Sequence, residues 1–134
     1  MAISSKSPFP CNAFNFEPIS SQYVQTKLEK LNNKKSPGYD AIPPKMLNKG
    51  ASVLCESLFP IINKSLTSSN FPDLLKYADV SPLFKKVDNL KKGNYRPVSV
   101  LTSTSKVFEG VMCDQLNSFF SNILEDMLSA YRKK

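Results

Sequence analysis

The strongest constraint on the fold is a change of pattern at residue 78, where helical spacing of apolar residues gives way to two short stretches typical of β-strands. They read "ADVSPLFKK" (78–86) and "YRPVSVL" (95–101), and the loop between them is rich in Lys, Asn and Gly. Val, Phe and Tyr favour strands, so this pattern predicts an antiparallel β-hairpin with a long tip. Because proline cannot donate a hydrogen bond to a ladder, Pro82 and Pro97 indicate that each strand has an unpaired edge.

Two stretches before the hairpin have helical periodicity. "SSQYVQTKLEKLNN" (20–33) predicts a helix with Ser20 as its N-cap and Val24, Leu28 and Leu31 on one apolar stripe. Residues 44–68 also read as helical, because Pro44 suits the first position of a helix. Proline inside a helix removes a hydrogen bond, so we expect a kink or a break at Pro60. The apolar side of this stretch is formed by Leu54, Leu58, Ile61, Ile62 and Leu66.

The two ends of the chain differ in pattern. After "TSTS", which offers several N-cap candidates, residues 106–128 predict a long amphipathic helix. Residues 1–18 have no period and are expected to form an irregular arm. The expected fold class is therefore α+β, with several helices around a small antiparallel β-hairpin. The stripe of the last helix consists of Phe108, Val111, Met112, Leu116, Phe119 and Ile123.

Composition narrows the chemistry. The chain has 134 residues, enough for one domain, and its 18 Lys and Arg against 11 Asp and Glu give a net charge of +7. Such a balance favours a polyanionic partner, most often nucleic acid. The chain has no histidine, which excludes Ser–His–Asp and Cys–His nucleophiles, and its three separated cysteines predict no zinc site. Without an apolar leader or a long apolar run, we expect an intracellular protein of the cytoplasm or nucleus that does not contact a membrane.

The positive charge is concentrated on the predicted hairpin. Five basic residues and Asp88 give +4 between residues 85 and 96, more than half of the net charge. Arginine on a strand can bind a phosphate through two hydrogen bonds, and lysines at a loop tip act as point charges. Lysines on an edge strand also protect against aggregation, and composition alone does not separate these two roles. The basic residues are Lys85, Lys86, Lys91, Lys92 and Arg96.

Five motifs occur along the chain in an order and spacing that resemble the reverse transcriptase domain of non-LTR (LINE-type) retrotransposons. They are "KSPGYDAIPPKML" (35–47), "NKSLTSSNFP" (63–72), "KYADVSPLFKK" (76–86), "NYRPVSVLTSTSKVFEGV" (94–111) and "SAYRKK" (129–134). The resemblance implies that residues 19–134 are the fingers portion of such a domain, with motifs 0 to 2. The parent function it implies is RNA-directed DNA polymerisation.

The resemblance also implies roles for individual residues. The fingers hairpin of the family folds over the incoming deoxynucleotide, so Arg96 would bind its triphosphate and Lys85 would be a second ligand. The hairpin loop and the "SPGYD" turn would lie near the template strand. The residues expected to contact nucleic acid are Lys86, Lys91, Lys92, Lys35, Ser36 and Gly38.

The family's catalytic groups are expected to lie outside this chain. Palm aspartates of the family, in motif A and in an F/Y-x-D-D motif, hold two Mg²⁺ ions that clamp the reacting oxygens. No Asp-Asp pair occurs in this sequence. We therefore expect no catalytic residue, no metal site and no polymerisation by the chain alone, with Mg²⁺ bound only where a palm is present. RNA template, DNA primer and dNTP would be partners of the parent enzyme. A stand-alone nucleic-acid-binding module and an inert remnant of a decayed element remain alternatives.

Overall fold

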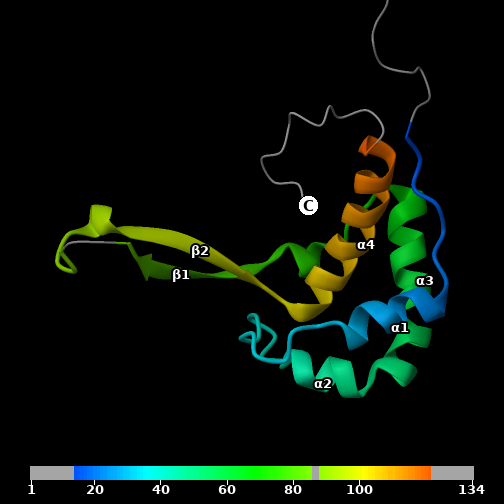
Figure 1. The fold of residues 1–134 in the computed structure, drawn as a ribbon, viewed down its shortest axis with the longest axis horizontal. Helices are drawn as coiled ribbons and strands as arrows, with labels where there is room; N and C mark the ends of the chain where they lie inside the picture. Colours follow the sequence, from blue (N-terminus) through cyan, green and yellow to red (C-terminus); the bar gives the residue numbers. More distant parts are fainter. Residues whose placement is uncertain (1–13, 86–87, 122–134) are drawn as a thin grey trace, which may run out of the picture.

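The computed structural model describes residues 14–85 and 88–121. These residues form four α-helices and one two-stranded antiparallel sheet, which confirms the predicted α+β class. Figure 1 shows the hairpin of β1 and β2 extending away from a body made of the helices. The α-helices are α1 (Ser21–Glu29), α2 (Pro44–Lys49), α3 (Ala51–Ser68) and α4 (Ser103–Phe120), and the strands are β1 (Ala78–Phe84) and β2 (Tyr95–Leu101).

Local signals determine where α1 and α2 begin. The Ser20 hydroxyl accepts a hydrogen bond from the N–H of Tyr23 at 3.3 Å, which confirms Ser20 as the N-cap of α1. Pro44 occupies the first turn of α2, where its missing N–H costs nothing because that group would have no partner in the helix. Gly50 lies between α2 and α3.

The break considered at Pro60 does not occur, because α3 is continuous from Ala51 to Ser68. Pro60 has no N–H for the carbonyl of Glu56, but both residues are exposed, so water can satisfy that carbonyl. Ile61 was expected on the buried side and is 50% exposed, whereas Ile62 is buried. The core therefore uses a narrower stripe of α3 than the sequence pattern indicated.

The core lies where α1, α3 and the first turns of α4 meet. Val24 and Leu28 of α1 are fully buried, as predicted, and Phe108 of α4 packs edge-to-face on Phe71 with ring centroids 5.9 Å apart. Helix α4 begins earlier than residue 106, since Thr102 is its N-cap. Ile123 and the motif at 129–134 lie outside the described residues. The buried apolar residues are Val24, Leu28, Leu47, Ala51, Cys55, Ile62, Leu66, Val107, Phe108 and Val111.

Two carboxamides hold the segment that precedes α1. Residues 14–18, the described part of the predicted arm, have no regular secondary structure. Gln115 of α4 accepts from the N–H of Glu17 at 2.8 Å and donates to its carbonyl at 2.9 Å. Asn63 of α3 makes the same pair of bonds to Ile19, at 2.8 and 2.9 Å. Each amide thus binds the arm backbone as a neighbouring strand would.

Candidate nucleic-acid interface

The hairpin register places the two predicted phosphate ligands together. Arg96 is directly opposite Leu83, and the N–H of Lys85 donates to the carbonyl of Asn94 at 2.7 Å, which extends the ladder by one pair. Side chains of paired residues share a face, and so do residues two apart on one strand. Arg96 and Lys85 therefore lie on the same face of the hairpin, as diagonal neighbours, and both are exposed.

Pro82 and Pro97 lie opposite each other in this register. In an antiparallel ladder, every second pair of residues exchanges no hydrogen bonds, and its N–H and C=O groups point away from the partner strand. Two prolines can face each other only at such a pair, because neither has an N–H to donate. The described residues add no third strand to either edge, which agrees with the unpaired edges that the prolines indicated. The missing N–H groups hinder pairing with another strand at both edges.

The opposite face of the hairpin is aromatic near the tip. Phe84 and Tyr95 are paired in register, and their ring centroids lie 5.5 Å apart. Phe84 is 46% exposed and Tyr95 is 36% exposed. The hairpin therefore has one cationic face and one face with an exposed aromatic pair.

Asp88 organises the tip. Its carboxylate accepts from the N–H of Leu90 at 2.9 Å, and its carbonyl accepts from the side chain of Asn94 at 2.7 Å. The hydroxyl of Tyr95 donates to the carbonyl of Asn89 at 2.9 Å. The only acid of the segment is thus engaged in turn hydrogen bonds of the kind that aspartate favours.

The described basic side chains of the hairpin, those of Lys85, Lys91, Lys92 and Arg96, are exposed and form no ion pair. The ion pairs among the described residues are Lys27–Asp114 and Lys76–Asp73, and neither involves the hairpin. Lys91 and Lys92 flank the start of a short 3₁₀ turn, Lys92–Asn94. Lys86 lies outside the described residues. Phosphate binding by these residues stays a prediction.

The "SPGYD" turn lies against the start of α4. Gly38 is buried, and a Cβ built on it would stand 2.7 Å from the backbone N and Cα of Thr102. Close packing therefore explains why glycine occurs here, and its predicted contact with nucleic acid stays untested. Lys35 and Ser36, by contrast, are exposed and line a cavity of about 450 Å³. This cavity lies between the turn, the end of β2 and the start of α4.

Ser103 and Lys106 also line that cavity, and the sequence did not predict either as a site residue. The stretch "TSTS" was interpreted as a source of N-caps and as part of the motif at 94–111, and no ligand role was assigned to Ser103 or Lys106. A serine and a lysine in the first turn of a helix that follows a basic hairpin could have been recognised as a site for an anion.

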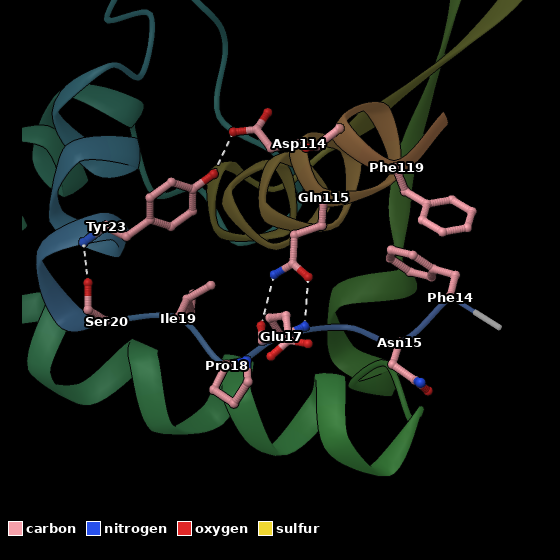
Figure 2. A pocket seen from close by; sticks show the side chains of 11 residues that line it. Phe14, Asn15, Glu17, Pro18, Ile19, Ser20, Tyr23, Asp114, Gln115 and Phe119 are labelled. Atoms are coloured by element: carbon pink, nitrogen blue, oxygen red, sulfur yellow. Dashed lines mark hydrogen bonds between the residues drawn. The ribbon is translucent and has the colours of Figure 1, made fainter. Parts of the chain in front are cut away.

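A larger cavity of about 740 Å³ lies between the arm, α1 and α4 (Figure 2). On one side, the hydroxyl of Tyr23 donates to Asp114 at 2.5 Å, and Lys27 pairs with the same carboxylate. Burial, followed by the hydrogen bond to Asp114 and the charge of Asp114, raises the pKa of Tyr23 to about 12. On the other side, Phe14 packs on Phe119 with ring centroids 5.1 Å apart. None of the predicted site residues lines this cavity.

The described part of the chain has neither a metal-binding cluster nor a membrane-spanning helix. It contains no group of three or more Cys, Asp or Glu side chains arranged to hold a metal ion. None of its helices combines the length and apolar character that crossing a membrane requires.

The described residues thus combine a helical body with a basic hairpin, and comparison with known proteins indicates the origin of the chain. No family model matches the sequence. It is 31% identical, over 96 residues, to the Retrovirus-related Pol polyprotein from type-1 retrotransposable element R1 of Bradysia coprophila. The match covers 70% of this chain and 10% of that polyprotein, so the chain spans only about a tenth of the relative's length. The likeness supports a retrotransposon-related origin for this chain.

Proposed function

We propose that the chain is the fingers portion of the reverse transcriptase domain of a non-LTR retrotransposon. In this proposal its hairpin binds phosphates of the template and of the incoming dNTP. The observation that carries the proposal is the placement of Arg96 and Lys85 on one exposed face of the hairpin. The match to a retrotransposon Pol polyprotein supports the same assignment.

The two side chains have different parts in this proposal. The guanidinium of Arg96 is planar and can donate two parallel hydrogen bonds to one phosphate. Pro97 restrains the backbone before it, so the direction of Arg96 is better defined than that of a loop residue. Lys85 adds a compact charge on the same face, and the exposed Lys91 and Lys92 attract the polyanion more generally.

Catalysis belongs to other residues in this proposal. The resemblance assigns the Mg²⁺-binding aspartates to a palm, and this sequence contains no Asp-Asp pair. The hairpin would hold phosphates in place, and the metal ions of the palm would supply the Lewis-acid chemistry of nucleotidyl transfer.

Binding of a short fluorescent single-stranded RNA, measured by anisotropy over a range of salt concentrations, tests the proposal. Arg96→Ala should weaken binding about tenfold, as expected for loss of a charge-assisted contact. The double change Lys91→Gln and Lys92→Gln should reduce the slope of log K against log salt by about one to two units, because each lysine neutralises up to one phosphate.

Lys64→Gln is the matched control, because this exposed lysine lies on α3 and not on the hairpin. It should change neither the affinity nor the salt slope by a comparable amount. Titration with a fluorescent dNTP analogue addresses the nucleotide ligand, and Arg96→Ala should weaken this binding as well. The proposal would be refuted if the hairpin variants bound RNA as tightly as the unmodified chain does, and likewise bound the dNTP analogue as tightly.

A further inference from the structure

The cavity at the base of the hairpin is positively charged. Its lining includes Lys35 and Lys106 and, among the described residues, no Asp or Glu. Asn32 shapes the loop that carries Lys35, since its side chain accepts from the N–H of Lys34 at 2.9 Å. A concave site with two cations and no acid attracts an anion. Residues from three separate segments contribute to it, namely Leu31, Asn32, Lys35, Ser36, Pro44, Ser99, Val100, Ser103 and Lys106.

The start of α4 forms one wall of this cavity. The Thr102 hydroxyl accepts from the N–H of Ser105 at 3.1 Å, and the Thr102 carbonyl accepts from the N–H of Lys106 at 3.2 Å. The N–H groups of Ser103 and Thr104 are then left without an acceptor inside the helix. The helix has 18 residues, so its dipole adds partial positive charge at this end.

Ser103 supplies a separate indication of a ligand. Its side chain is fully buried beside the cavity, and its Oγ has no hydrogen-bond partner among the described residues. A buried hydroxyl without a partner is costly, and folded proteins rarely keep one. The neighbouring Thr102 and Ser105 are buried too, but their hydroxyls are bonded to each other at 2.8 Å.

We propose that this cavity binds a phosphate group. The Ser103 hydroxyl and the N–H groups at the start of α4 donate hydrogen bonds to its oxygens, and Lys35 and Lys106 neutralise its charge. The phosphate could belong to a nucleic acid backbone or be free in solution. The choice of the backbone rests on the function proposed above, whereas the phosphate chemistry rests on the cavity alone.

The direct test is NMR titration of the whole chain with inorganic phosphate and, separately, with a short single-stranded RNA. Both ligands should shift the amide resonances of Ser103 and Thr104, because these groups donate to the bound anion. If neither ligand shifts them, the site does not bind phosphate and the inference fails. If inorganic phosphate alone shifts them and RNA does not compete, the backbone assignment is wrong.

Ser103→Ala separates a ligand-binding role from a structural one. The variant should bind phosphate and RNA about tenfold more weakly, the usual effect of losing a hydrogen bond to a charged group. Its thermal midpoint should not fall, because the Oγ bonds to nothing in the described fold. Ser57→Ala, on an exposed position of α3, is the matched control and should leave binding unchanged. A Ser103→Ala chain that binds phosphate and RNA normally would overturn the proposal.

Comparison of two charge variants distinguishes this site from the hairpin. Lys106→Gln should weaken binding of inorganic phosphate, and Arg96→Ala should leave the phosphate-induced shifts of Ser103 and Thr104 in place. If only Arg96→Ala weakens RNA binding, the assignment of the cavity to a nucleic acid backbone fails and the proposed function stands. If Lys106→Gln also leaves the binding of inorganic phosphate unchanged, the cavity inference fails altogether. If only Lys106→Gln weakens RNA binding, Arg96 does not bind RNA phosphates as proposed, and the cavity inference stands.

Discussion

Gly38 packs directly on the backbone of Thr102, although 64 positions separate the two residues in the sequence. A Cβ built on Gly38 would stand 2.7 Å from the N and Cα of Thr102 and 2.9 Å from the carbonyl carbon of Leu101. These are backbone atoms, which cannot turn away as the end of a flexible side chain would. The contact joins the "SPGYD" turn to the junction of β2 and α4.

Gly38→Ala should therefore destabilise the chain by about 1 to 3 kcal/mol, the usual cost of overpacking. Urea denaturation followed by circular dichroism measures the change. Gly93→Ala is the control, since a Cβ there meets no atom within 4 Å and the residue does not have a positive φ. Its effect should stay within about 0.5 kcal/mol. Equal stability of the two variants would show that the Gly38 contact is not tight.

Thr102 caps α4, and its loss should be costly. The residue is 1% exposed, and its hydroxyl bonds both the N–H and the Oγ of Ser105. Thr102→Ala should lower the free energy of unfolding by about 1 to 2 kcal/mol, and Thr102→Ser should retain most of the stability. Thr104→Ala, in the same turn but partly exposed, should change it by less than about 0.5 kcal/mol. A Thr102→Ala variant as stable as Thr104→Ala would contradict the capping role.

Asn63 ties the arm to α3 through two hydrogen bonds with Ile19. Asn63→Ala should cost about 1 to 3 kcal/mol, because both backbone groups of Ile19 lose their acceptor or donor in a partly buried place. Asn63→Asp keeps the oxygen that accepts from the N–H of Ile19, but it places a negative charge against the Ile19 carbonyl. This variant should therefore be about as unstable as Asn63→Ala. Limited proteolysis should cleave the arm faster in both variants, and unchanged cleavage would show that the Asn63 hydrogen bonds do not hold the arm in place.

Tyr23 makes stability depend on pH at the alkaline end. Its pKa is raised from 10.0 to about 12, mainly by burial and also by Asp114. Between these two pH values the unfolded state binds fewer protons than the folded state, so stability falls as pH rises. The contribution of Tyr23 to the free energy of unfolding is complete below pH 10.0 and is lost by about pH 12.

The difference in phenolate absorbance between the unmodified chain and Tyr23→Phe isolates this group. It should show one phenol that titrates near pH 12 and not near 10.0. Removing the hydroxyl should also lower stability at neutral pH by about 1 kcal/mol, a typical value for one hydrogen bond. A difference curve centred at 10.0 would show that Asp114 and burial do not affect this phenol.

Helix starts and the hairpin, which depend on residues close together in the sequence, were predicted correctly. Ser20 capped α1, Pro44 opened α2, and the β-type stretches paired as a hairpin, because each signal acts within a few residues. At Pro60 the sequence predicted a kink or a break, and the break does not occur, since packing along the rest of α3 can offset the cost of one proline.

The candidate sites depended on more than local pattern. Sequence alone identified Arg96 and Lys85 as charged residues of one hairpin, but the ladder register decided that they share a face. The cavity that joins Lys35 to Ser103 and Lys106 was not foreseen, because its walls come from segments far apart in the chain.

The sequence by itself determined the helices, the hairpin and the amount of positive charge, since these follow from propensity, capping and composition over short distances. Only the tertiary structure decided which charges meet and which buried hydroxyl has no partner among the described residues. Helix packing brings the "SPGYD" turn against α4, and the missing Cβ of Gly38 permits that approach. Contacts of this kind depend on the relative positions of whole elements, which local patterns do not specify.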